Sequence, residues 1–153
     1  MESNVKILEP EILMPQLLEL MKDAHTVPLV ISGSSMTPFL VHGRDTVYLS
    51  KAEHPLKRGD MILYRRACGA YVLHRIYAEK DGSYTLVGDA QTLLETGIQP
   101  EQVLAVVSAV RRKGKLLKKG DLCWDFFEKV WIRMVPLRPA AGVAYGSLKR
   151  LLK

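Results

Sequence analysis

Residues 32–40 are a serine-rich segment, Ser32-Gly33-Ser34-Ser35-Met36-Thr37-Pro38-Phe39-Leu40. The segment follows an apolar run from Pro28 to Ile31, which predicts a short strand, and it precedes the turn residues 42–45. Because glycine lets the backbone turn sharply at the end of a strand, the Ser35 hydroxyl can be exposed there. Serine-rich turns are common, so this segment alone is most simply a turn.

Short apolar runs separated by turn residues continue on the C-terminal side of this segment. They cover residues 46–50, 61–66, 71–78, 83–87 and 103–112, and the separators are rich in glycine and aspartate. This pattern predicts a mainly β fold, with an antiparallel β domain of about ninety residues at 27–118.

Helical spacing of apolar residues flanks the β region on both sides. From Pro10 to Ala24 it predicts an amphipathic helix, which Pro15 must start or kink, within an N-terminal segment 1–26. After Asp121 it predicts a basic, aromatic helical appendage within residues 119–153.

The 153-residue chain has a net charge of +6, and this charge is unevenly distributed. Residues 1–110 hold 10 Lys and Arg against 13 Asp and Glu, whereas residues 111–153 hold 12 against 3. No signal-peptide pattern opens the chain, and no apolar run reaches the roughly 18 residues of a spanning helix. We therefore expect a cytoplasmic protein in which Cys68 and Cys123 are free thiols, a single disulfide being the alternative.

Two further segments carry groups suited to acid–base chemistry. His74 lies within the apolar strand Tyr71-Val72-Leu73-His74-Arg75-Ile76, where an imidazole can act as a base or simply pack in the core. Asp89 ends the run Leu86-Val87-Gly88-Asp89, and Glu95 follows six residues later. A carboxylate that orients an imidazole would complete a Ser-His-acid site, although each segment alone is more simply structural. The histidines have no metal-ligand spacing, so a metal site is not expected.

Taken in order, five segments resemble the conserved boxes of signal peptidase I and its relatives, the self-cleaving LexA-like repressors. They are Ser35-Met36-Thr37-Pro38 with Leu40, Gly43-Arg44-Asp45, Arg58-Gly59-Asp60-Met61-Ile62-Leu63-Tyr64, Leu73-His74-Arg75-Ile76 and Gly88-Asp89. The resemblance covers residues 31–110. His74 matches the members whose base is histidine, namely the endoplasmic-reticulum, archaeal and sporulation types.

The resemblance implies a serine endopeptidase that cleaves signal or leader peptides next to small residues, without metal or cofactor. Ser35 would be the nucleophile, His74 the general base, and the backbone N–H of Ser35 an oxyanion donor. Gly33 replaces a hydroxyl residue that supplies a second oxyanion donor in some relatives, so that donor is missing or comes from elsewhere. We expect Asp89 to orient His74, with Glu95 as the alternative acid.

The chain also departs from the resemblance. The segment before Ser35 is too short and too charged to span a membrane, and Ala90-Gln91 replaces the two asparagines common in histidine-type members. No DNA-binding domain fits before the β region, and no Ala-Gly or Cys-Gly cleavage bond precedes Ser35, which argues against a repressor.

Two questions of partners stay open at this point. The aromatic and basic residues of 122–153 suit either packing on the β domain or peripheral contact with an anionic membrane, and they do not suit nucleic acid. The alternative to an endopeptidase is a catalytically degenerate module of the same fold that holds a peptide by strand addition.

Overall fold

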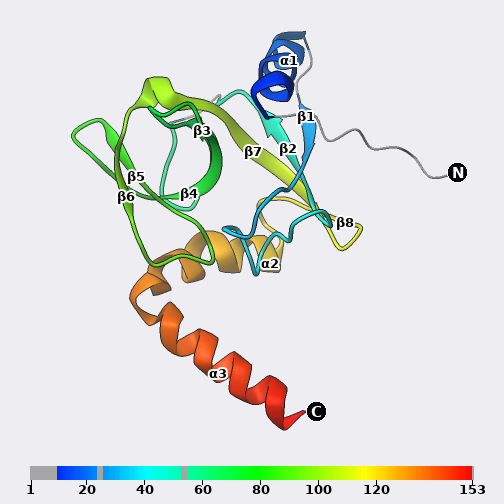
Figure 1. Cartoon of the computed structure of the whole chain (residues 1–153), viewed down its shortest axis with the longest axis vertical. Coiled ribbons are helices and arrows are strands. Elements are labelled where there is room, and N and C mark those ends of the chain that lie inside the picture. Colours follow the sequence, from blue (N-terminus) through cyan, green and yellow to red (C-terminus); the bar gives the residue numbers. More distant parts are fainter. Residues whose placement is uncertain (1–9, 24–25, 53–54, 153) are drawn as a thin grey trace, which may run out of the picture.

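The computed structural model describes residues 10–23, 26–52 and 55–152. Within these ranges the chain forms a single sheet of eight strands in which every pairing is antiparallel (Figure 1). The order is β1-β2-β7-β3-β4-β5-β6, and β8 pairs with β7. The strands are β1 (Val27–Val30), β2 (Thr46–Ser50), β3 (Met61–Arg65), β4 (Tyr71–Lys80), β5 (Ser83–Val87), β6 (Glu95–Ile98), β7 (Val103–Arg112) and β8 (Lys115–Leu117). The prediction of a mainly β, antiparallel fold is confirmed.

The six predicted strands are all present, and two short ones were not predicted. β6 is four residues long, contains Gly97 at a positive φ of 75°, and buries only Ile98 fully. β8 has three residues and buries only Leu117. Neither segment is long enough to show an alternating apolar pattern, which is why the sequence does not reveal them.

Helices flank the strand region on both sides, and one short helical turn lies between β6 and β7. They are α1 (Pro10–Asp23), the 3-10 helix η1 (Pro100–Gln102), α2 (Leu122–Asp125), the π-helical turn η2 (Phe126–Val130), the 3-10 helix η3 (Trp131–Leu137) and α3 (Arg138–Leu151). The predicted N-terminal helix is confirmed; it begins at Pro10 with Pro15 inside it, and its predicted end, Ala24, lies outside the described residues. None of the helices in the described ranges is sufficiently long and apolar to cross a membrane.

The sheet is curved, so residues of strands that are not neighbours meet on its concave side. Tyr64 of β3 hydrogen-bonds Glu95 of β6, although β4 and β5 lie between these two strands in the sheet. Irregular register at Leu63/Tyr64 and at Ile76/Ala78 accompanies this curvature, as bulges do in strongly bent strands. The curvature brings together side chains that are far apart in the sequence.

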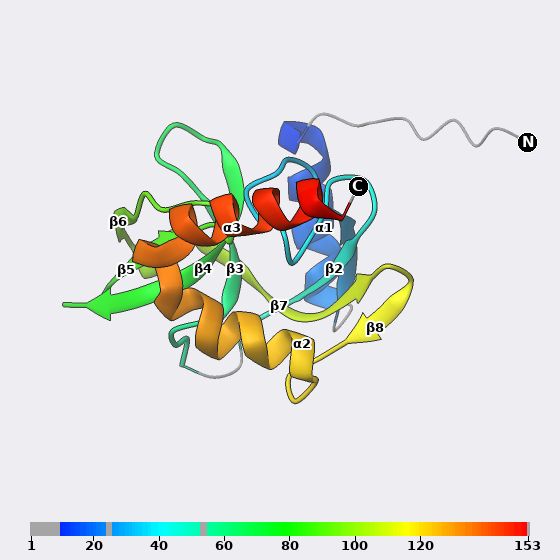
Figure 2. The same cartoon turned by 90° about the horizontal axis from the view of Figure 1, so that it is seen from below.

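The C-terminal helical turns contribute to the core. Trp124 and Phe127 are buried, and their rings lie 6.1 Å and 4.8 Å from the ring of Phe39, in the serine-rich segment. A Cβ at Gly59 would lie 2.4 Å from the Glu128 carbonyl oxygen, so only glycine permits this contact. Figures 1 and 2 show α1 and α2 on opposite sides of the sheet, and Figure 1 shows α3 extending away from it. For Trp124 and Phe127 the packing alternative is therefore the one realised.

Candidate functional site

His74 lies in the middle of β4, with its ring almost completely buried. It pairs with Ile62 of β3, and only 3% of the residue is exposed. Its Nδ1 atom is 3.1 Å from the Tyr64 hydroxyl oxygen. Burial lowers the pKa of His74 to about 4, because a buried ring is less stable in its charged form. The negative charge of Glu95 favours the protonated ring but offsets this effect only in part. The imidazole is therefore neutral near pH 7, the state that a general base needs.

Gly88 lies next to both His74 and the backbone of Ser35. A Cβ at position 88 would lie 3.1 Å from His74 Nε2 and only 2.5 Å from the Ser35 carbonyl oxygen, so a side chain does not fit between them. That same oxygen accepts a hydrogen bond of 2.9 Å from the Ala90 N–H. The backbone of Ser35, the Nε2 side of His74 and the loop after β5 thus lie close together.

The polar groups of Ser35 are free within the part of the chain that the structure describes. Ser35 is half-buried, its hydroxyl forms no hydrogen bond there, with His74 or otherwise, and its N–H makes no backbone hydrogen bond. An unpaired N–H next to a free hydroxyl can bind a developing oxyanion. The Gly33 N–H, by contrast, donates to His42 Nδ1 at 2.9 Å. It is therefore not free to act as a second oxyanion donor.

Two cavities adjoin this place. The smaller has a volume of about 110 Å³ and is lined by residues 31–33, 35, 36 and 71–73, so it opens directly beside Ser35. The larger has a volume of about 440 Å³ and is lined by Arg66 and residues 90–95. The Ala90 to Glu95 loop therefore lines the second cavity while its first residue binds the Ser35 carbonyl.

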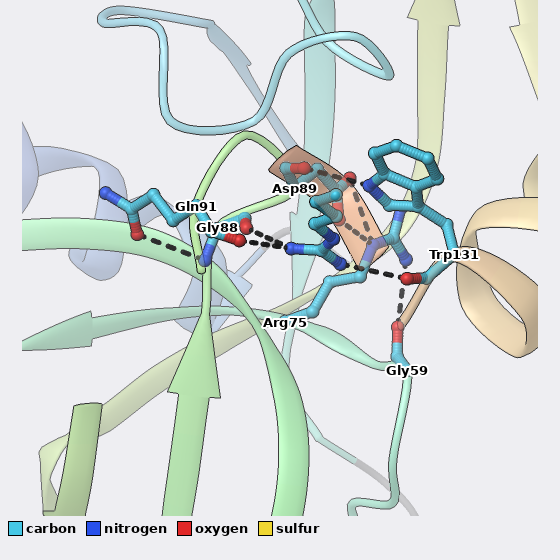
Figure 3. Close-up of polar contacts among 7 residues, drawn as sticks. Gly59, Arg75, Gly88, Asp89, Gln91 and Trp131 are labelled. Atoms are coloured by element: carbon cyan, nitrogen blue, oxygen red, sulfur yellow. Dashed lines mark hydrogen bonds and ion pairs between the residues drawn. The ribbon is translucent and has the colours of Figure 1, made fainter. Parts of the chain in front are cut away.

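Asp89 is held by Arg75, not by His74. The buried Arg75 Nε lies 2.9 Å and 3.1 Å from the two Asp89 carboxylate oxygens, and Arg75 Nη1 donates to the Gly59 carbonyl oxygen at 2.9 Å (Figure 3). Among the described residues, neither Asp89 oxygen hydrogen-bonds His74. Burial raises the pKa of Asp89, and the Arg75 charge opposes that rise. Arg75 therefore links its own predicted box to those of Gly59 and Asp89. The Asp89 carboxylate pairs with this arginine, which differs from the expected orientation of His74.

The C-terminal segment holds the same loop from the other side. The Trp131 indole N–H donates to the Asp89 carbonyl oxygen at 2.8 Å, and Arg138 Nη1 donates to those of Gly88 and Gln91 (Figure 3). The Arg138 guanidinium also stacks over the Trp131 ring at 5.1 Å. Residues 88–91 are thus fixed by side chains from β4 and from the C-terminal helices.

Glu95, the alternative acid, is the carboxylate connected to His74. Its Oε2 accepts a 2.6 Å hydrogen bond from the Tyr64 hydroxyl, and Arg66 donates to both of its oxygens, at 2.9 Å and 3.0 Å. Burial alone would raise the pKa of Glu95, but the hydrogen bonds from Arg66 and Tyr64 outweigh it and lower the pKa. Burial and Glu95 both raise the pKa of Tyr64, so its hydroxyl stays protonated. Geometry favours Glu95 over Asp89 as the acid that acts on His74.

Four residues to which the sequence analysis gives no role contribute to the candidate site. Tyr64 and Arg66 contact Glu95, whereas Arg75 and Arg138 hold residues 88–91. Tyr64 offered one signal, because it is a tyrosine in an apolar strand and a buried tyrosine hydroxyl needs a hydrogen-bond partner. No cluster of three or more His, Cys, Asp or Glu suited to a metal ion occurs among the described residues. Both cysteines are free; Cys68 is exposed and Cys123 half-buried.

Comparisons with protein-family models, with curated proteins and with solved structures found no match to this chain.

Proposed function

We propose that this chain is a serine endopeptidase of the signal-peptidase and LexA-like type that cleaves signal or leader peptides. The observation that carries the proposal is the meeting of Ser35 with the Nε2 side of a neutral His74 beside Gly88. A free hydroxyl, an unpaired N–H and a neutral imidazole are the groups that acyl transfer requires. Five ordered sequence boxes add support, and three of them meet at this place.

In the proposed reaction, His74 transfers one proton during formation of the acyl ester and one during its hydrolysis. Its Nε2 accepts the Ser35 proton while Oγ forms a bond to the peptide carbonyl carbon, and the Ser35 N–H stabilises the oxyanion. When the tetrahedral intermediate collapses, the C–N bond breaks and Nε2 gives the proton to the leaving amine. Water then attacks the acyl ester, again with His74 as base, and releases Ser35. These steps use only groups of the chain, the substrate and water.

The cavity beside Ser35 supports a small side chain next to the scissile bond. Its volume of about 110 Å³ equals roughly the liquid volume of four water molecules. An alanine or serine side chain fits such a space, in line with the small residues that the family resemblance implies. The larger cavity, which the Ala90 to Glu95 loop lines, offers room for the rest of an extended peptide.

Covalent labelling of Ser35 tests the proposal. A fluorophosphonate probe should label the purified full chain at Ser35, and Ser35→Ala and His74→Ala should each abolish both labelling and peptide cleavage, because members of one catalytic unit fail together. Ser34→Ala is the matched control, since Ser34 is an exposed neighbour in the same turn. Absence of labelling while a peptide still binds would favour the degenerate peptide-binding module.

A further inference from the structure

We propose that Tyr64 is a positioning residue that fixes the tautomer of His74 and links it to Glu95. The hydroxyl oxygen of Tyr64 lies 3.1 Å from His74 Nδ1 and 2.6 Å from Glu95 Oε2, so it bridges the two side chains. The catalytic consequence rests on the proposed function, whereas the tautomer is a property of the resting protein. Both can be measured separately.

The direction of each hydrogen bond follows from counting protons. A tyrosine hydroxyl has one proton, and an ionised carboxylate can only accept, so the 2.6 Å contact requires the hydroxyl to donate to Glu95. With its proton engaged, the Tyr64 oxygen can only accept from His74. The 3.1 Å contact therefore requires a proton on Nδ1.

The consequence for His74 is a lone pair on the opposite nitrogen. A neutral imidazole carries one N–H, so protonation of Nδ1 leaves Nε2 unprotonated. Nε2 is the nitrogen that lies near Gly88, where the backbone of Ser35 also approaches. In the other tautomer, the Nδ1 lone pair would face the lone pairs of the Tyr64 oxygen. Tyr64 thus presents the basic nitrogen of His74 to the nucleophile.

Arg66 keeps Glu95 in the state that the hydrogen bond from Tyr64 requires. It donates to both Glu95 oxygens and keeps that carboxylate ionised, which is the condition for Tyr64 to donate towards it. The charge of Glu95 favours an imidazolium at His74, while that of Arg66 opposes it. Because Glu95 acts through a hydroxyl and not directly, we expect loss of Tyr64 to weaken the reaction without abolishing it.

The tautomer is tested by long-range ¹H–¹⁵N spectra of the full chain at pH 7. His74, assigned by the signals missing in His74→Asn, should be protonated at Nδ1 in the wild type and should shift towards protonation at Nε2 in Tyr64→Phe. Tyr84→Phe is the matched control. Tyr84 packs against the apolar cluster that contains Tyr64 and Ile76. Its hydroxyl makes no hydrogen bond within the described residues.

A second variant reaches the same result by a different route. Glu95→Ala frees the Tyr64 proton to donate to Nδ1, so His74 should again shift towards the Nε2–H form, even if Tyr64→Phe does not fold. An Nε2–H tautomer in the wild type, or an Nδ1–H tautomer retained in both variants, would overturn the proposal.

Kinetics supply the catalytic readout. Tyr64→Phe should lower kcat roughly 10- to 100-fold with little change in KM, since a misplaced base mainly affects the transition state. A wild-type rate in a variant whose tautomer has shifted would remove the catalytic role. If the tautomer shifts as expected but a fluorophosphonate never labels Ser35 in the wild type, Tyr64 positioning is supported and the peptidase proposal fails.

Discussion

Arg138 donates a 2.8 Å hydrogen bond to the carbonyl oxygen of Gly88, across a separation of 50 residues. The same nitrogen lies 2.7 Å from the Gln91 carbonyl oxygen. Since Gly88 touches Ser35 and faces His74, the first residue of α3 reaches the candidate site through a single loop. Part of the C-terminal segment therefore supports the site rather than extending freely from the β domain.

Loss of this support should affect stability and labelling together. Arg138→Ala leaves the Gly88 and Gln91 carbonyl oxygens without their cationic donor, which should lower the free energy of unfolding by roughly 2–4 kcal/mol. Labelling of Ser35 should slow as the loop loosens. Urea denaturation measures the first effect, and Arg133→Ala, an exposed arginine of the same segment, is the control. Equal stability of the two variants would contradict this account.

A side chain at Gly88 should push Ser35 away from the loop. In Gly88→Ala the new Cβ would overlap the Ser35 carbonyl oxygen, which is backbone and cannot rotate aside. We expect at least a 100-fold loss of labelling rate, because displacements of about 1 Å at reacting groups have effects of this size. Gly82→Ala is the control: it strains a positive φ of 77° in open space, so it destabilises the chain away from the site. Equal rates of Ser35 labelling in the two variants would contradict the prediction.

The fold was largely predictable because its longer strands carry local patterns. Apolar runs of five residues or more, bounded by glycine and aspartate turns, correspond to strands such as β3 and β5. The curvature of the sheet could not be predicted this way. It depends on register shifts such as the one at Leu63/Tyr64, which leave no mark in the local pattern.

The candidate site was predictable only in part, for the same reason. Ser35, His74 and Gly88 come together in agreement with the sequence boxes. The partners of the two acids were not foreseen, because each contact joins residues far apart in the sequence. Glu95 meets Tyr64 across 31 residues, and Asp89 meets Arg75 across 14. The sequence favours Asp89 because it belongs to the Gly-Asp box, whereas the link of Glu95 to His74 runs through Tyr64 and leaves no local pattern.

Stability should depend on pH through His74. The pKa falls from an ordinary 6.5 to about 4 in the folded chain, so between these values the unfolded chain binds a proton that the folded chain does not. The contribution of neutral His74 is complete above pH 6.5 and is lost progressively as the pH falls to about 4, by up to roughly 3 kcal/mol.

Urea denaturation of the wild type and of His74→Asn at several pH values isolates this contribution. The difference in stability between the two proteins should shrink from pH 7 to pH 4 and then stay constant. The rate of Ser35 labelling should show its acid limb near pH 4 for the same reason. A constant difference, or an acid limb near pH 6.5, would contradict the low pKa.

The remaining prediction concerns membrane contact through residues 122–153. Trp124, Phe127 and Ile132 are buried in the core, so they are not available to lipid. Exposed apolar surface lies at the end of α3 and on the residue after it. There Leu148, Leu151 and Leu152 are 55%, 83% and 80% exposed. Residues 139–153 hold three Lys and Arg and no Asp or Glu, which complements an anionic bilayer.

We therefore expect the full chain to sediment with phosphatidylserine-containing vesicles at low salt and to be released at high salt, because one interfacial helix binds reversibly and its charge attraction is screened. The triple variant Leu148→Ser, Leu151→Ser, Leu152→Ser should reduce binding at least about tenfold, since each leucine withheld from lipid forfeits roughly 1.5–3 kcal/mol at full burial. Leu122→Ser, which changes a leucine of α2 that is 90% exposed, is the control and should bind like the wild type. If binding is absent at low salt, or if it survives the triple substitution, the end of α3 does not bind lipid and the prediction is wrong.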